Sequence, residues 1–318
     1  MLGLVTVVGG SGFVGRYVVQ ELVAAGARVR VAVRRPNQAV ALKPLGGVGQ
    51  IQLIAADVRD GAAMKAAMHG ADAAVNLVGI LAEGGGRTFK GIQAEGAGKV
   101  ARAAAEAGAG AFVQVSAIGA DAASPSAYGR SKAAGEAAVL AAFPRATILR
   151  PSLIFGPEDA FINRFAALAK ASPVMPVVAG ATRFQPVYVV DVARAVVAAL
   201  TDPGRFGGHT YVLGGPKTYS MRELLQYILH EIRMDKPLID VPAFAAKLIG
   251  RVGDNLPGMP ITSDQYKLLQ RDNVVLPGQP DLAALGIAPT PMEAVAPGYL
   301  QRYRQFGRFN DRNEPATD

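Results

Sequence analysis

Tyr128, Lys132 and Ser116 are the residues whose types and spacing best suit proton transfer. Tyr128 and Lys132 lie four residues apart, so they share one face of a helix, and Ser116 lies twelve residues before Tyr128. A nearby ammonium stabilises a phenolate and lowers the pKa of the tyrosine. Of the nine tyrosines, only Tyr128 has a lysine at this offset. The pair is a candidate acid–base site with Ser116 as a further hydroxyl; an amphipathic helix with one exposed tyrosine and one lysine has the same pattern.

A glycine-rich turn, GGSGFVG, occupies residues 9–15. It follows an apolar, strand-like run at residues 2–8 and opens an amphipathic helical pattern that ends at Gly26. Glycines at this spacing supply a tight turn, close approach of a phosphate to backbone N–H groups, and close helix packing. The motif therefore predicts a dinucleotide cradle. Its candidate residues are Gly9, Gly12, Phe13, Val14 and Gly15.

The choice between NAD and NADP depends on the residues after the second strand. A carboxylate there binds the ribose 2′-hydroxyl of NAD, whereas arginine accommodates the 2′-phosphate of NADP. This chain has Arg34 and Arg35 and no acid at that point, which favours NADPH over the alternative of two solvated surface arginines. Asp57 and Val58, after the third strand, are placed to meet the adenine edge, although an aspartate there also serves as an ordinary turn residue.

Short apolar runs alternate with helix-length segments through the first half of the chain. This rhythm predicts a Rossmann-type, doubly wound parallel sheet. We expect the NADPH-binding domain to cover residues 1–156 and to be rejoined by about 184–202, with a strand near 184–190. A smaller, irregular α/β region is expected at 157–183 and 203–318. The expected strands are 28–33, 51–55, 73–78, 111–115 and 146–149, and the expected helices are 61–68, 93–107, 126–142, 191–200 and one from a capping box at Ser220 to about Ile232.

Composition excludes several classes of protein. The 318 residues contain no cysteine, and the three histidines lack metal-ligand spacing, so we expect no disulfide, thiolate or metal site. The charge of +8 favours anionic partners, but no nucleic-acid motif is present. The longest uncharged stretch, residues 1–15, is too short to span a bilayer and does not resemble a signal peptide, so a cytoplasmic location is expected.

Several motifs together resemble one family. The glycine turn, the Asp57-Val58 pair, Asn76-Leu77-Val78-Gly79 and the Tyr128/Lys132 pair look like an extended or atypical short-chain dehydrogenase/reductase. Further along, the chain is similar to the NADPH-binding accessory subunits of respiratory complex I, NADH:ubiquinone oxidoreductase, and their bacterial homologues. The motifs that carry this likeness are 149–159 (LRPSLIFGPED), 182–189 (TRFQPVYV), 213–216 (LGGP) and 269–275 (LQRDNVV).

The resemblance implies tightly held NADPH contacted by Tyr128, Lys132 and Pro151. It also implies a peripheral place on a membrane respiratory complex, on the cytoplasmic or matrix face. Active short-chain dehydrogenases commonly have two adjacent Ser/Thr residues after the fifth strand, where this chain has Ser116 and then Ala117. Ser116 or Ser126 could substitute for the missing hydroxyl, and spacing does not decide between them. The departure favours an accessory role over the alternative, an NADPH-dependent reductase, epimerase or dehydratase acting on a small or quinone-related substrate.

The C-terminal end interleaves aromatic residues with arginines and has no acid between residues 299 and 309. This composition suits an acidic protein surface or an anionic membrane face, although a terminal helix packed on its own domain has the same pattern. The residues are Tyr299, Arg302, Tyr303, Arg304, Phe306, Arg308 and Phe309.

Overall fold

The computed structural model describes residues 2–254, 261–305 and 307. These residues form two compact units. The first contains residues 2–152, 189–214 and 275–289, and the second contains 153–188, 215–254, 261–274 and 290–305, with 307. Each unit has its own core and is considered by itself.

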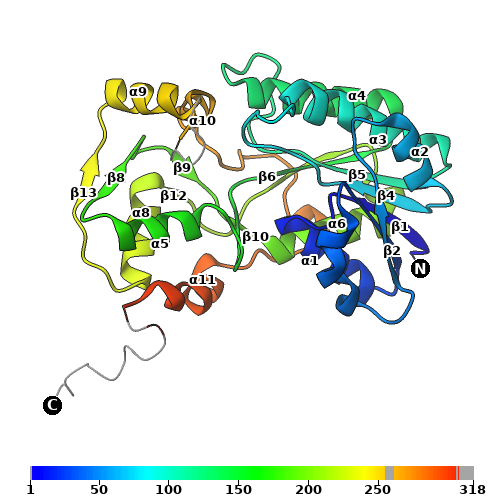
Figure 1. The fold of residues 1–318 in the computed structure, drawn as a ribbon, viewed down its shortest axis with the longest axis horizontal. Helices are drawn as coiled ribbons and strands as arrows, with labels where there is room; N and C mark the ends of the chain where they lie inside the picture. The colour runs from blue at the N-terminus through cyan, green and yellow to red at the C-terminus, as the bar shows by residue number, and fades with distance from the viewer. Residues whose placement is uncertain (1, 255–260, 306, 308–318) are drawn as a thin grey trace. The chain divides into compact units, whose positions relative to one another are not determined.

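The first unit is built on a parallel sheet of seven strands, counted over the described residues (Figure 1). Its order is β11-β6-β5-β4-β1-β2-β3, so the strand order reverses between β1 and β4. This is the expected doubly wound arrangement, in which ligands bind beyond the carboxyl ends of the strands near the reversal. The strands are β1 (Leu4–Val8), β2 (Arg28–Val33), β3 (Ile51–Ala55), β4 (Ala73–Asn76), β5 (Ala111–Val115), β6 (Thr147–Pro151) and β11 (Thr210–Leu213).

Helices cover both faces of this sheet (Figure 1). On one face α1 (Phe13–Ala24) packs beside α6 (Val189–Thr201). On the other face lie α2 (Gly61–Met68), α3 (Glu95–Glu106) and α4 (Ala127–Ala142). The unit also contains η1 (Pro36–Leu45), the π-helical turn η2 (Lys90–Ala94), α7 (Pro203–Phe206) and η3 (Ala283–Leu285).

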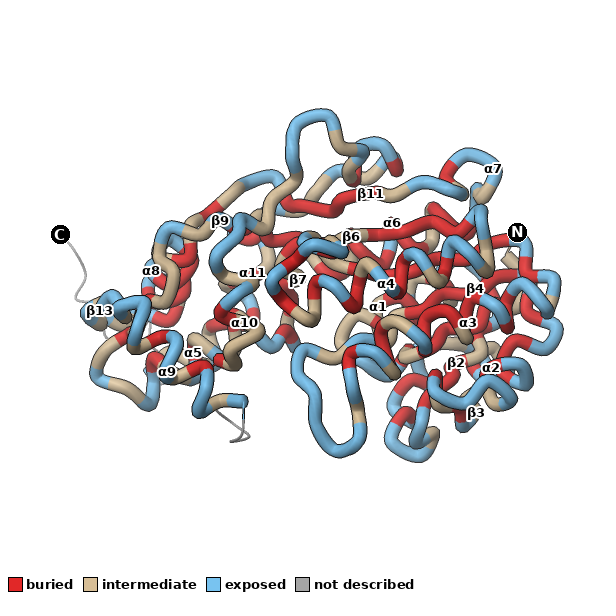
Figure 2. Tube along the Cα trace, turned by 90° about the horizontal axis from the view of Figure 1, so that it is seen from above, coloured by how far each residue is buried: buried red, intermediate tan, exposed pale blue. Residues whose placement is uncertain are grey.

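The central strands are short and apolar because both of their faces are covered. Every residue of β4 and β5 is buried, as Figure 2 shows for β4. The expected strands at 28–33, 51–55 and 111–115 and the expected helix at 61–68 coincide with β2, β3, β5 and α2. The predicted fold class is confirmed.

The second unit contains two-stranded sheets and helices around a separate core. Its strands pair as β7 (Ile154–Phe155) with β10 (Val187–Tyr188), β8 (Met175–Val177) with β13 (Leu238–Asp240), and β9 (Arg183–Phe184) with β12 (Tyr219–Ser220). Its helices are α5 (Ile162–Ala171), α8 (Met221–Glu231), α9 (Ala243–Gly253), α10 (Ser263–Leu268), α11 (Met292–Leu300) and η4 (Gln301–Tyr303). The capping box at Ser220 is present, as expected, and starts α8.

Two features of the middle of the chain differ from the prediction. The strand expected near 184–190 does not join the main sheet: Pro186 interrupts it, and the two pieces pair within the second unit as β9 and β10. The chain instead returns to the main sheet through β11, which pairs in parallel with β6. Residues 189–214 and 275–289 therefore belong to the first unit, rather than 184–202. No helix of the described ranges is long and apolar enough to cross a bilayer.

Candidate functional site

The glycine turn lies where β1 passes into α1. Gly9 has a φ of +84°, which side chains rarely tolerate, and its N–H donates to the Ala32 carbonyl at 3.0 Å. The Gly12 N–H donates back to Gly9 O at 3.1 Å, which closes the turn. Gly12 is the N-cap of α1, and no side chain caps this helix end. The positive end of the helix dipole is therefore left for an anion.

Gly15 and Gly12 are glycines for different physical reasons. A Cβ at Gly15 would lie 2.5 Å from Gly9 O, so packing within the protein excludes any side chain there. A Cβ at Gly12 would meet only Gly9 O at 3.4 Å, an ordinary contact, and its φ of −74° suits any residue. Nothing in the protein requires glycine at 12, whereas a phosphate approaching the helix end does. The turn therefore fits a dinucleotide.

A pocket of about 230 Å³ opens beside this turn, at the reversal between β1 and β4. It brings together residues that follow three strands: Gly9 after β1, Arg34 after β2, and Asp57 and Val58 after β3. Val58 is buried and also packs against α3 at Gly96. Four sequence-predicted residues thus share one cavity. Ser11 of the glycine turn and Gly79 of the Asn76-Leu77-Val78-Gly79 motif line it too, as does Arg87, which the sequence analysis did not single out.

Cations dominate the rim of the pocket. Arg34 and Arg35 are exposed directly after β2, and Arg34 lines the cavity, whereas Arg35 does not. A two-point ion pair with Arg59 engages the Asp57 carboxylate and, with a smaller contribution from Arg34, holds its pKa below the usual range. Asp57 is therefore ionised and already neutralised, which leaves Arg34 available to an anionic ligand.

Arg87 belongs to a glycine-rich turn that follows β4. The Arg59 guanidinium donates to Gly86 O at 3.2 Å, so the arginine that pairs with Asp57 also stabilises this turn. Arg87 lies in a loop without hydrophobic periodicity, so sequence reasoning missed it. The run Gly84-Gly85-Gly86 before an arginine was the available signal.

The candidates for proton transfer are Ser116, which follows the carboxyl end of β5, and residues at the start of α4. Ser126 is the N-cap of α4: its hydroxyl accepts from Gly129 N, so it serves the helix rather than a substrate. Tyr128 packs edge-on against Phe89, and the Lys132 ammonium lies 5.8 Å from the Tyr128 ring centre. Lys132 Nζ donates to Val115 O at 3.4 Å, which places the ammonium next to Ser116.

Burial decides the protonation of the Tyr128/Lys132 pair. Burial raises the pKa of Tyr128 to about 12, so the expectation that the lysine lowers it is wrong. Burial also lowers the pKa of Lys132 to about 8, and the nearby Glu136 carboxylate opposes that shift. Tyr128 therefore keeps its proton at neutral pH.

Ser116 carries an unsatisfied hydroxyl. Its side chain is 5% exposed, and its Oγ has no hydrogen-bond partner within the described protein. A buried polar atom without a partner is costly, so a ligand group that fills this role is a good fit. Ala117 follows it and is half-buried, and Pro151, the last residue of β6, accepts from Ile118 N at 3.1 Å.

Gly79 connects this end of the site to the pocket. It lines the cavity, and a Cβ there would lie 3.3 Å from Lys132 Nζ. Glu136 lies one turn after Lys132 on α4, and its carboxylate attracts the Lys132 ammonium. The same carboxylate accepts two hydrogen bonds from Arg150. The sequence analysis did not predict the Glu136–Arg150 ion pair, although Glu136 lies four residues after Lys132.

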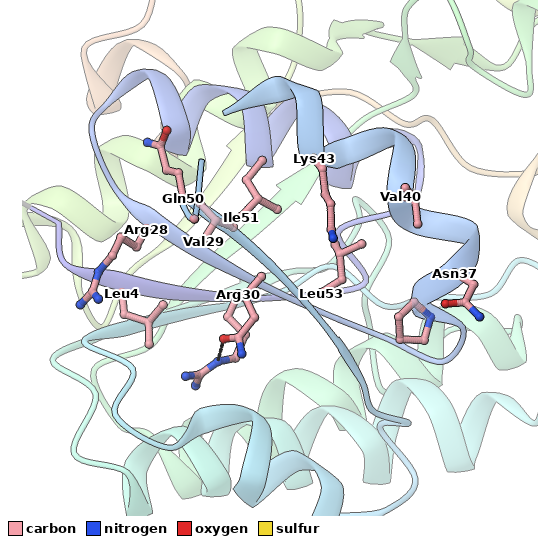
Figure 3. A pocket seen from close by; sticks show the side chains of 13 residues that line it. Leu4, Arg28, Val29, Arg30, Asn37, Val40, Lys43, Gln50, Ile51 and Leu53 are labelled. Atoms are coloured by element: carbon pink, nitrogen blue, oxygen red, sulfur yellow. Dashed lines mark hydrogen bonds between the residues drawn. The ribbon is translucent and has the colours of Figure 1, made fainter. Parts of the chain in front are cut away.

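A larger pocket of about 560 Å³ lies by the edge strand β3 and η1, away from the glycine turn (Figure 3). Arg28, Arg30 and Lys43 line it, and Arg30 donates to Ala67 O, to His69 O and to the Gln52 side chain. These groups satisfy the Arg30 guanidinium within the protein, and the pocket contains no residue of the glycine turn. Among the described residues no cluster of His, Cys, Asp or Glu could hold a metal ion.

The described part of the aromatic C-terminal segment is packed. Tyr299 is buried and donates to Asp159 at 3.1 Å, and burial raises the pKa of that carboxyl. Arg302 donates to Pro157 O, and Arg304 donates to Glu231 O. These residues stabilise the second unit. Phe306, Arg308 and Phe309 lie outside the described residues.

Comparison with known proteins identifies the family. Residues 5–214 match the model of the NAD dependent epimerase/dehydratase family, which is more than half of the chain. The chain belongs to this family.

Two relatives show to which group within this family the chain belongs. The mitochondrial NADH dehydrogenase (ubiquinone) 1 alpha subcomplex subunit 9 of Arabidopsis thaliana is 36% identical over 314 residues, which cover 95% of this chain and 78% of the relative. Its counterpart from Mus musculus is 35% identical, with 95% and 80% covered. The chain belongs to the family of these subunits, and the predicted resemblance is confirmed.

A solved structure supports the fold. The NADPH-dependent quinone oxidoreductase of Escherichia coli, in complex with NADPH, superposes with a TM-score of 0.74 over 93% of this chain and 99% of that one. At 19% identity this likeness concerns the fold alone.

Proposed function

We propose that this chain is an NADPH-binding accessory subunit of a respiratory NADH:quinone oxidoreductase. We place it peripherally on the cytoplasmic or matrix face of the energy-transducing membrane. One observation carries the proposal: the likeness to the subunit 9 relatives extends over 95% of the chain, through both units. A shared cofactor domain alone would have produced a match limited to the first unit.

The cofactor assignment follows the geometry of the first unit. The pyrophosphate is held at the start of α1 by Gly9, Gly12, Phe13, Val14 and Gly15, where Gly12 leaves the approach open. Arg34 and Arg35, joined by Arg87, bind the 2′-phosphate, which makes NADPH the preferred nucleotide. Asp57 and Val58 meet the adenine, and Tyr128, Lys132 and Pro151 border the nicotinamide end.

NADPH, when bound, supplies a hydride. Within the protein, Tyr128 holds a proton at neutral pH and Lys132 fixes the ribose beside it. Ser116 is the hydroxyl that remains for a carbonyl oxygen, since Ser126 caps α4 and Ala117 has no hydroxyl. The second hydroxyl, common in active short-chain dehydrogenases, is missing at Ala117. Loss of one such donor raises a reaction barrier by about 2.7–4 kcal/mol, so we expect NADPH to be turned over slowly or not at all.

A tagged copy of the chain, expressed at its native level, tests the assembly role. Purification from native membranes in mild detergent should recover NADH:quinone oxidoreductase activity together with bound NADPH. Recovery of the chain alone, from membranes whose complex is intact, overturns the proposal.

One observation favours a second candidate, an active NADPH-dependent reductase, epimerase or dehydratase. The unpartnered Ser116 hydroxyl lies next to the residue that holds Lys132, so the three catalytic residue types are gathered. A screen of aldehydes, ketones and quinones distinguishes the candidates. Rapid NADPH oxidation that Tyr128→Phe abolishes would establish the enzyme and remove the non-catalytic part of our proposal.

A further inference from the structure

Helix α9 of the second unit exposes an apolar stripe. Phe244, Leu248 and Val252 recur every four residues, and their exposed fractions are 76%, 61% and 39%. At a rise of about 1.5 Å per residue, the stripe runs about 12 Å along the helix. An apolar stripe of this kind ordinarily faces a core, but here it faces outward.

The opposite face of α9 is already occupied. Ala246 is buried in a small cluster with Ile261 and Tyr266, and Ile249 packs against that cluster. A Cβ at Gly250 would lie 3.1 Å from the backbone of Ser263, so α9 sits closely on the start of α10. Rotation of α9 to bury the stripe would expose this packed inner face. Figure 2 shows α9 with both exposed and buried residues.

Basic residues share the outer face of α9. Lys247 and Arg251 are both exposed and follow Phe244 and Leu248 by three residues each. The helix, Ala243–Gly253, contains no acidic residue. Long cationic side chains beside apolar ones can bury their methylene stems while their charges reach phosphate groups. The whole chain carries +8, which adds attraction to an anionic surface.

We propose that α9 binds the surface of an anionic lipid bilayer. It lies in the plane of the headgroups with Phe244, Leu248 and Val252 in the acyl boundary and with Lys247 and Arg251 on lipid phosphates. The helix, at 11 residues, is too short to span the bilayer. This proposal deepens the proposed function, and it rests on that function for the presence of a membrane near the chain.

The absence of tryptophan from the chain provides a direct probe. Leu248→Trp introduces a single fluorophore into the stripe, and Val48→Trp introduces one at a fully exposed apolar position of the first unit. With phosphatidylcholine vesicles containing about one third phosphatidylglycerol, emission of the Leu248→Trp protein should shift to shorter wavelength, and emission of the Val48→Trp protein should not. No shift at 248, or equal shifts at both positions, overturns the proposal.

Two double variants separate the apolar and charged contributions in vesicle flotation. Phe244→Ser/Leu248→Ser should weaken binding to the anionic vesicles by more than about tenfold, because two large apolar side chains no longer leave water. Lys247→Glu/Arg251→Glu should weaken it on the anionic vesicles and leave the weak binding to pure phosphatidylcholine unchanged. Val48→Ser/Leu276→Ser, which alters two exposed apolar residues of the first unit, is the matched control.

Thermal melts followed by circular dichroism report whether each variant is folded, and NADPH titration reports whether the site in the other unit is intact. Failure of the wild-type chain to bind vesicles while it copurifies with the oxidoreductase overturns the lipid proposal alone. Vesicle binding without copurification overturns the proposed function alone. If Phe244→Ser/Leu248→Ser releases the chain from the oxidoreductase yet leaves vesicle binding unchanged, the stripe contacts protein and the lipid proposal is wrong.

Discussion

The two units differ in the kind of surface that their folds leave available for binding. In the first unit the turn at Gly9 and Gly15 is determined by close contacts within the protein, and the opening at Gly12 faces a helix end without a side-chain cap. In the second unit the sheets are pairs of short strands, and α9 presents an apolar stripe to the outside. We infer that the first unit binds a small anionic ligand and that α9 of the second unit binds a surface. The predictions below test that contrast.

The largest effect should come from the glycine turn. Gly12→Val should abolish NADPH binding, because the side chain occupies the phosphate approach, and should change the melting temperature of the apo protein little. Gly15→Ala should instead destabilise the apo protein by about 1–3 kcal/mol, since its Cβ collides with the turn. Isothermal titration and thermal melts check both. Equal effects of the two variants on folding would show that Gly12 also serves packing.

The arginines should control the choice of nucleotide. Arg34→Ala/Arg35→Ala should weaken NADPH binding by about 10–100-fold, the usual range for lost hydrogen bonds to a charged group, and leave NADH binding nearly unchanged. Arg87→Ala should act in the same direction by about tenfold, whereas Arg28→Ala, at an exposed position of β2, should do nothing. Calorimetric titration with both nucleotides measures this. An NADH affinity as high as that for NADPH in the wild-type chain contradicts the assignment.

Lys132 should make the stability of the protein depend on pH. Its folded pKa of about 8 lies below its ordinary value of 10.5, so above pH 8 the unfolded chain binds a proton that the folded chain releases. The free energy of unfolding should therefore rise by roughly 2 kcal/mol between about pH 8 and about pH 9.5. Lys132→Met should lack this rise. Urea unfolding of both proteins across this range tests it, and parallel profiles would show that the lysine is not desolvated.

The smallest effect should come from Tyr299. Tyr299→Phe removes one hydrogen bond to Asp159, which keeps its backbone donors Gly156 and Ile162, so the cost should be about 1 kcal/mol with NADPH binding unchanged. Denaturant unfolding and NADPH titration measure the two quantities. Release of the variant from native membranes without loss of stability would mean that the C-terminal segment docks rather than packs. Truncation before Tyr299 is a poor test of docking, because it also removes the buried Leu300.

Sequence patterns located the elements of the first unit well because both faces of its sheet are covered. Buried parallel strands read as apolar runs, and the glycine turn has a required spacing, so β2, β3, β5 and α2 coincide with their predicted ranges. Strand β11 was missed because its four residues follow a short helix and carry no period of their own. The two-residue strands of the second unit are too short to show an alternating pattern of apolar and polar residues in the sequence.

The sequence predicted those site residues whose type is constrained by backbone geometry. It did not predict the pKa values of buried residues, because these depend on how the fold excludes water. Spacing placed Tyr128 and Lys132 on one helix, but only the structure shows that desolvation outweighs their mutual attraction. Arg87 lies on a loop, where position does not follow from spacing. The apolar positions of α9 were visible in the sequence, yet amphipathicity alone does not say which face a fold covers.

The nucleotide in the purified respiratory complex tests the central claim most directly. The complex is isolated through the tagged chain, and its nucleotide is extracted and quantified before and after NADH-driven quinone reduction. We expect about one NADPH per chain, unchanged in amount and still reduced after turnover. Absence of nucleotide from a complex that contains the chain, or its conversion to NADP⁺ during turnover, would contradict a retained, structural NADPH.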